Sequence, residues 1–61
     1  MRIWRVEHWV NHNEYLIATH IVARKVERME GSEISVLADG VEITFSERIE
    51  SIEVEGELGD V

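Results

Sequence analysis

The stretch ISVLADGVEITFS, residues 34–46, decides how the rest of this 61-residue sequence is interpreted. Asp39-Gly40 separates two runs of alternating residues, which is the strongest short-range signal for a β-hairpin. Pairing Ala38 with Val41 puts the apolar side chains on one face, namely Ile34, Val36, Ala38, Val41, Ile43 and Phe45. Leu37 is the only large apolar residue on the other face, which otherwise carries Glu33, Ser35, Glu42, Thr44 and Ser46. The stretch therefore predicts two antiparallel strands with one buried face.

A second hairpin is expected upstream, with strands from Ile3 to Val10 and from Tyr15 to Val22. The residues between them, Asn11 to Glu14, are typical of a turn because Asn tolerates left-handed backbone geometry. Pairing Val10 with Tyr15 gives one face with Trp4, Val6, His8, Val10, Tyr15, Ile17, Thr19 and Ile21. The opposite face has Ile3, Arg5, Glu7, Trp9, Leu16, Ala18, His20 and Val22. Both faces are partly apolar, so we expect the hairpin to curl into a barrel or to be covered by a partner.

The connecting segment IVARKVERME, residues 21–30, fits two interpretations. Val22, Val26 and Met29 have helical spacing, and Thr19 and Gly31 could cap such a helix. Its β-branched residues lower helix propensity, and the hairpin that follows needs an antiparallel neighbour, so we favour a bent strand. The alternative is an α+β fold with a helix at about residues 20–30.

Beyond the hairpin of residues 34–46, a short turn or one helical turn at residues 46–48 precedes a last strand from Ser51 to Glu55, with Ile49 and Ile52 returning to the core. Residues 56–61 are expected to be a frayed tail. The fold class predicted for the single domain 1–61 is therefore all-β. We expect five antiparallel strands in a small barrel or curled sheet.

A family resemblance covers Val22 to Val54, which reads VARKVERMEGSEISVLADGVEITFSERIESIEV. This resembles the strand–turn–strand–DG–strand–short turn–strand pattern of small SH3-like barrels, which occur in ribosome-maturation and RNA-handling proteins. The resemblance implies a barrel with a protein-binding surface. Those families often use basic surfaces, whereas this stretch is strongly acidic.

The charge of the chain is uneven. There are 13 acidic and 6 basic residues, for a net charge of −7, and residues 26–61 hold eleven of the acids and only two of the bases. A negative field repels phosphate and attracts basic surfaces, so we expect a basic protein partner and no direct binding of nucleic acid. A small, cysteine-free, strongly acidic chain is similar as a class to phage-encoded inhibitors such as anti-CRISPR proteins that mimic DNA.

The candidate partner-binding residues are mostly glutamates of the second half. Residues two apart on a strand lie about 6.8 Å apart and point the same way, so Glu53, Glu55 and Glu57 would form a row on the scale of backbone phosphates. Together with an apolar pair they make up the predicted surface: Glu33, Glu42, Glu47, Glu50, Glu53, Glu55, Glu57, Trp9 and Leu16. The leading hypothesis is an inhibitor that occupies the basic nucleic-acid-binding surface of a partner protein.

Two other interpretations remain open for these residues. The acids could simply keep a small protein soluble and prevent unwanted pairing of sheet edges. The chain could also be a structural or adaptor subunit that uses an SH3-like surface, or a homodimer that forms through Trp9 and Leu16, since tryptophan is enriched at the centres of interfaces.

Catalytic and metal chemistry is not expected. His8, His12 and His20 fall on one face, on the turn and on the opposite face, and so do not converge on an ion with Glu7 or Glu14. There is no cysteine, and Ser32, Ser35, Ser46 and Ser51 have no neighbouring histidine and acid pattern. We expect no enzyme activity and no cofactor. The N-terminus has no signal pattern and no run is long enough to span a membrane, so the expected location is the cytoplasm.

Overall fold

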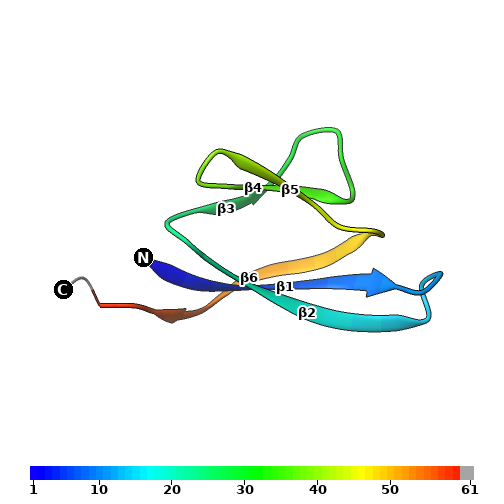
Figure 1. Cartoon of the computed structure of the whole chain (residues 1–61), viewed down its shortest axis with the longest axis horizontal. Helices are drawn as coiled ribbons and strands as arrows, with labels where there is room; N and C mark the ends of the chain where they lie inside the picture. The colour runs from blue at the N-terminus through cyan, green and yellow to red at the C-terminus, as the bar shows by residue number, and fades with distance from the viewer. Residues whose placement is uncertain (60–61) are drawn as a thin grey trace.

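The computed structural model describes residues 1–59, and its regular structure is entirely β. The strands are β1 (Arg2–Val10), β2 (Tyr15–Ala23), β3 (Val26–Arg28), β4 (Ser35–Ala38), β5 (Val41–Thr44) and β6 (Ile49–Glu57). They form two antiparallel sheets, a first sheet in the order β2-β1-β6 and a second sheet in the order β3-β4-β5 (Figure 1). The prediction of an all-β fold is confirmed.

Both predicted hairpins have the expected register. Val10 pairs with Tyr15 in the first sheet, and Ala38 pairs with Val41 in the second. Asp39 and Gly40 both have positive φ, 49° and 81°, as a two-residue hairpin turn of this type requires. The β1–β2 turn is built differently, from three consecutive left-handed residues, Asn11, His12 and Asn13. This β1–β2 turn extends beyond the end of the second sheet (Figure 1).

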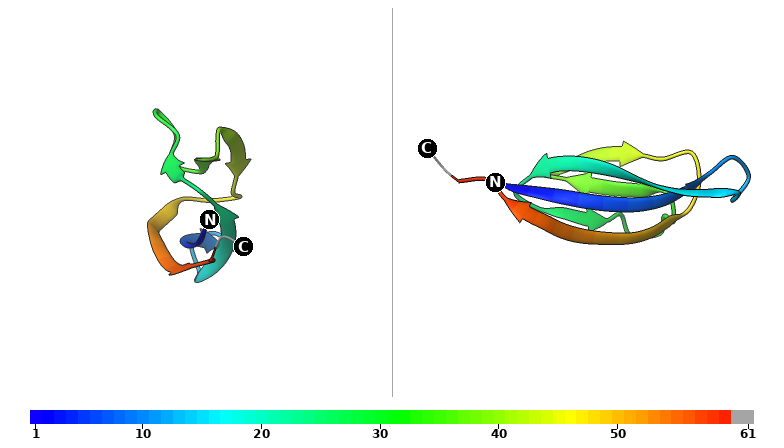
Figure 2. Two further views of the ribbon diagram at one scale, coloured as in Figure 1. Left: turned by 90° about the vertical axis from the view of Figure 1, so that its left-hand side faces the viewer. Right: turned by 90° about the horizontal axis from the view of Figure 1, so that it is seen from below.

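The number of strands differs from the expected five because the predicted bent strand is divided in two. The segment 21–30 contains the end of β2, a break at Arg24 and Lys25, and then β3. At the break, the backbone N–H groups of Arg24 and Lys25 donate to the Asp39 carboxylate, at 3.0 and 2.9 Å. No helix is present between residues 1 and 59, so the α+β alternative is wrong. The two sheets do not close into a barrel (Figure 2).

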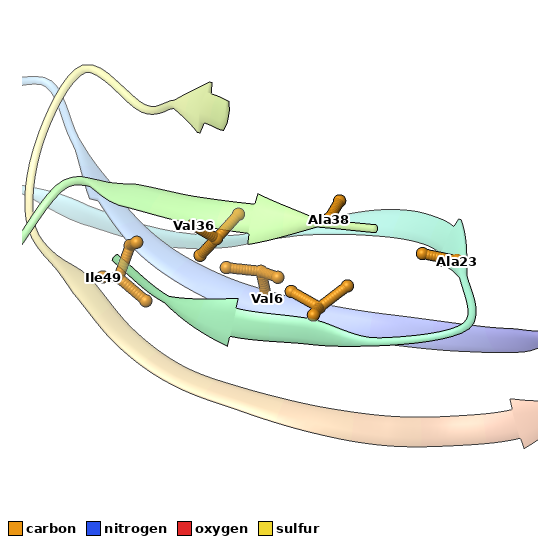
Figure 3. Close-up of a cluster of buried hydrophobic side chains, with 6 residues drawn as sticks. Val6, Ala23, Val36, Ala38 and Ile49 are labelled. Carbon is orange, nitrogen blue, oxygen red and sulfur yellow. The ribbon is translucent and has the colours of Figure 1, made fainter. Parts of the chain in front are cut away.

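The hydrophobic core is a thin layer between the two sheets (Figure 3). Its buried members come from both sheets: Val6, Ala23, Val26, Val36, Ala38 and Ile49. Trp4, Ile21, Ile43, Phe45 and Ile52 pack against them. Val41 and Ile34, which the sequence placed on the buried face, are 64% and 38% exposed because they lie at the two ends of their hairpin. Ser35, expected on the polar face, is buried, and its hydroxyl lies 3.0 Å from Thr44 Oγ1.

Strand β6 is longer than the predicted Ser51 to Glu55. It begins at the buried Ile49 and continues through Gly56 and Glu57, two residues that the sequence assigned to the tail. Beyond the strand, the backbone N–H of Leu58 donates to the carbonyl of Met1 at 2.9 Å. The last two residues of the expected tail, 60–61, lie outside the described residues. No helix in the described chain could cross a membrane.

Candidate functional site

Three of the four carboxylates of β6, those of Glu50, Glu53 and Glu55, lie on one face of the first sheet, and two β-bulges in the strand determine which three. Its register against β1 shifts between Ile3 and Trp4 and again between Glu7 and His8, which leaves Glu55 and Glu50 without ladder partners. A bulge adds a residue to one strand and so redirects its side chain. We define the outer face as the face of the first sheet turned away from the core, containing Arg5, Glu7, Trp9, Glu50, Glu53 and Glu55.

Contacts across the sheet fix the two bulged glutamates on the outer face. The indole Nε1 of Trp9 donates to Glu50 Oε1 at 3.1 Å. His20 Nε2 lies 2.9 Å from Glu55 Oε2, and a guanidinium nitrogen of Arg5 lies 3.9 Å from the same oxygen. Both glutamates therefore project among the side chains of β1 and β2.

Basic residues offset only part of the charge on the outer face. Arg5 lies between Glu7 and Glu55, at 3.9 Å from each, and Arg48 lies 3.5 Å from Glu50. Such solvent-exposed ion pairs contribute little free energy and do not shield the remaining carboxylates. Glu53 has no ion pair or hydrogen bond from its side chain within residues 1–59. Four carboxylates thus face two guanidinium groups, and the surface stays negative.

Trp9 and Leu16 form a direct cross-strand pair on the same outer face. Leu16 is 40% exposed, and Trp9 is partly buried. The guanidinium carbon of Arg48 sits 5.9 Å from the Trp9 ring centroid, and the Trp9 backbone N–H donates to the Arg48 carbonyl at 2.9 Å. These contacts with Arg48 and Glu50 hold the indole in one orientation beside the Glu50 carboxylate.

The predicted row of three glutamates is broken at its end. Because the bulge opposite Ile3 and Trp4 adds Glu55, Gly56 pairs with Ile3 and Glu57 pairs with Arg2, which places Glu57 on the opposite face from Glu53. Glu57 forms an ion pair with Arg2 there, at 2.8 Å. The expectation that Glu53, Glu55 and Glu57 point the same way is therefore wrong for Glu57.

Two further predicted residues lie on other elements. Glu42 is on β5 in the second sheet, where its carboxylate accepts a hydrogen bond from the Thr44 hydroxyl at 3.1 Å. Glu33 is exposed in the loop before β4, and its carbonyl accepts the N–H of Ile49 at 2.8 Å. The structure does not bring Glu33 and Glu42 onto the outer face.

Two carboxylates, which we call the turn carboxylates, serve the fold itself. Glu47 accepts the backbone N–H groups of His12 and Asn13, at 2.9 and 2.7 Å, and so holds the β1–β2 turn from the far end of the sequence. Asp39 accepts those of Arg24 and Lys25. These backbone N–H donors lower the pKa of Asp39 below its ordinary value of 3.8, because they stabilise the charged form. Neither contact was foreseen from the sequence.

The three histidines lie where the sequence placed them, on different parts of the first sheet. His8 is buried on the core side, with Nε2 2.7 Å from Thr19 Oγ1 and its ring 4.3 Å from that of Phe45. His12 is in the turn, and His20 is on the outer face beside Glu55. Across the described part of the chain, no three potential metal ligands come together.

Comparison with known proteins gives no relative for this chain. No family model matches it, and no curated protein or solved structure is significantly similar. The resemblances to SH3-like barrels and to acidic phage inhibitors therefore have no support from a homologue.

Proposed function

We propose that this protein is a non-enzymatic binding protein that docks on a basic protein surface through its outer face. The finer form of the proposal is an inhibitor that covers the nucleic-acid-binding surface of its partner, in the manner of DNA-mimicking anti-CRISPR proteins. The observation that carries the proposal is that Glu50, Glu53 and Glu55 lie on the same exposed sheet face as Trp9 and Leu16, with Glu50 in contact with Trp9.

The electrostatic part of the proposal depends on the net charge as well as on the face. At −7 for 61 residues, the chain attracts basic surfaces from a distance of about 10 Å at moderate salt. Steering of this kind raises association rates and favours partners of the opposite charge. It also disfavours a nucleic acid as the direct ligand, because phosphates would meet the same field.

Trp9 and Leu16 would add an apolar contact to the electrostatic attraction in the complex. Trp9 is held by Glu50 and Arg48, so it loses little conformational freedom on binding. A tryptophan surrounded by polar groups is the usual composition of an interface centre with a polar rim. Leu16 extends that centre across the strand pair.

The test is capture of a partner from a lysate of the source cells, followed by direct competition. Immobilised protein should retain a nucleic-acid-binding protein at low salt and release it as salt rises. Glu50→Gln/Glu53→Gln/Glu55→Gln should lose the captured protein. Glu14→Gln/Glu27→Gln/Glu30→Gln, with the same change in net charge away from the outer face, should keep most of it. Added DNA or RNA should compete with the wild-type chain for the captured protein.

Two results would contradict the proposal. One is a captured partner whose affinity does not depend on salt. The other is equal binding by the outer-face variant and its matched control, which would show that net charge alone, and no particular face, is responsible.

The second candidate is a structural or adaptor subunit, and the Trp9–Leu16 pair is the observation that favours it. This alternative draws on the strand order, in which β2 and β3 are followed by a short meander and a returning β6, although the two sheets stay open. In that case Trp9→Ser/Leu16→Ser should abolish assembly, and the three outer-face glutamine substitutions should leave it intact.

A further inference from the structure

The two edges of the first sheet are chemically opposite. The sheet order β2-β1-β6 makes β2 and β6 its edge strands. Strand β6 carries four glutamates, and Arg28 of β3 donates to the carbonyls of Ile49 and Glu50 at its start, at 3.3 and 3.1 Å. Charged side chains and covering groups are the usual protection of an edge against pairing with another strand. The β6 edge is therefore protected.

Strand β2 has no such protection. Its nine residues, YLIATHIVA, include no acidic residue, no lysine or arginine, no proline and no glycine. Four of its large apolar side chains are substantially exposed, namely Tyr15 at 55%, Leu16 at 40%, Ile17 at 45% and Val22 at 57%. Within residues 1–59, β2 is paired along one side only, with β1. A long, uncharged, apolar edge of this kind is a template for another strand.

We propose that β2 pairs with β2 of a second copy, antiparallel and centred on Thr19, so that two chains share one continuous six-stranded sheet. In this register Leu16 faces Val22, Ile17 faces Ile21 and Thr19 faces Thr19 across the two-fold axis. The strand is thus nearly self-complementary in side-chain type. Pairs of aliphatic residues and pairs of threonines are both favourable across antiparallel strands.

Neighbouring strands extend this match on the outer face. Trp9 lies beside Leu16, and Ile3 lies beside Val22. In the proposed dimer, Trp9 and Leu16 of one chain would continue into Val22 and Ile3 of the other. A symmetric pair of apolar stripes would then cross the new seam, which is what an isologous interface requires.

The self-complementary side chains of β2 favour a second copy as the occupant, and the acidic residues of β6 limit further growth of the shared sheet. A net charge of −7 opposes self-association, but the backbone of β6 lies two strands from the seam, about 10 Å away. Of its glutamates only Glu55 contacts β2 within residues 1–59, where its carboxylate lies 2.9 Å from His20. Pairing β2 with β2 uses the unprotected edge of both chains. The remaining edges of the shared six-stranded sheet are β6 strands, where glutamates would face glutamates and repel. The dimer would present two acidic edges about 24 Å apart.

The experiment measures mass against concentration by sedimentation equilibrium and then tests the register. Wild-type protein should shift from the 7.1 kDa monomer to twice that mass as concentration rises. Leu16→Glu and Val22→Lys, both at exposed positions, should each weaken dimerisation about tenfold, because each places two unmatched charges at the seam. An equimolar mixture of the two variants should restore the dimer as a heterodimer, since Glu at 16 then faces Lys at 22.

The matched control is Val54→Lys, a substitution at a 44% exposed position on β6, which should leave the dimer unchanged. If the β2 variants fail to fold, amide hydrogen exchange of the wild-type chain replaces them, and protection of β2 should rise with concentration while that of β6 does not. A wild-type chain that stays monomeric up to its solubility limit would overturn the proposal. A mixture that remains monomeric would overturn the Leu16–Val22 register and with it the inference.

Discussion

The carboxylates of Asp39 and Glu47 differ from those of Glu50, Glu53 and Glu55 in what they bind. The turn carboxylates accept backbone N–H groups of residues far away in the sequence, at 2.7 to 3.0 Å. The outer-face carboxylates contact only side chains, or in the case of Glu53 nothing in the described chain. Hydrogen bonds from backbone N–H to a carboxylate are stronger than neutral ones and fix the chain.

This difference shows that the number of acidic residues overstates the charge that can recognise a partner. Glu47 was predicted to bind a partner, yet its two oxygens are both occupied by the β1–β2 turn. Glu53, Glu50 and Glu55 can exchange their exposed side-chain contacts for contacts with a partner at little cost in folding free energy. The turn carboxylates should therefore control stability, and the outer-face carboxylates should control binding.

The largest effect on stability is expected from Asp39→Ala. The substitution leaves the N–H groups of Arg24 and Lys25 without their carboxylate and puts Ala at φ 49°, a conformation that Asp and Asn tolerate better. The midpoint of thermal unfolding, followed by circular dichroism, should fall further than for any other single carboxylate. Asp39→Asn keeps an acceptor and the backbone tolerance, and should lose less. Equal losses in both variants would show that only the charge matters.

Lowering the pH should remove part of the stability that the Asp39 carboxylate contributes. The backbone donors lower the pKa of Asp39 below 3.8, so its stabilising effect is fully present above that pH and is lost as the pH falls through the folded-state pKa. The stability difference between wild type and Asp39→Asn should therefore narrow as pH is lowered below about 3.8. Urea unfolding of the wild type and of Asp39→Asn over a pH series measures this difference in unfolding free energy. A difference that stays constant down to the lowest pH would contradict the assignment.

Glu47→Ala should have the next largest effect, about 1 kcal/mol of unfolding free energy, since two hydrogen bonds to an exposed turn are lost. For a domain of this size the corresponding fall in Tm is about 4–8 °C. Amide exchange at His12 and Asn13 should accelerate at the same time. Glu47→Gln, which keeps an acceptor oxygen, is the control. A Glu47→Ala variant with normal stability but impaired partner capture would show that Glu47 binds the partner, as the sequence predicted.

The sequence predicted the parts of the fold that local patterns determine. Asp39-Gly40 between alternating runs gave the correct pairing of Ala38 with Val41, and the Asn-rich segment gave that of Val10 with Tyr15. The all-β class followed from these two hairpins. In both cases the information lies within a few residues of the turn.

The features that shape the candidate site depend on contacts between distant residues. Glu47 meets His12 across 35 positions, and Asp39 meets Arg24 across 15. The bulges at Glu50 and Glu55 follow from how β6 aligns with β1, which a two-residue periodicity in β6 alone cannot reveal. For this reason the sequence identified the right strand but placed Glu57 on the wrong face.

The smallest effect on stability is expected from Glu53→Gln. Glu53 has no partner in residues 1–59, so the change in unfolding free energy should stay within about 0.5 kcal/mol. Its sign should be slightly favourable, because one negative charge is removed from a chain of net charge −7. Glu30→Gln, an equal charge change at an exposed position outside the outer face, is the matched control for both folding and binding.

The substitutions Glu53→Gln and Glu30→Gln should differ in their effect on the affinity for a partner. With a partner captured as proposed above, Glu53→Gln should lower the affinity more than Glu30→Gln, while thermal unfolding of the two variants remains the same. A loss of more than 1 kcal/mol of stability in Glu53→Gln would mean that this carboxylate also serves the fold. The distinction between the two sets of carboxylates would then fail, since an outer-face carboxylate with no contact in residues 1–59 would prove to be structural.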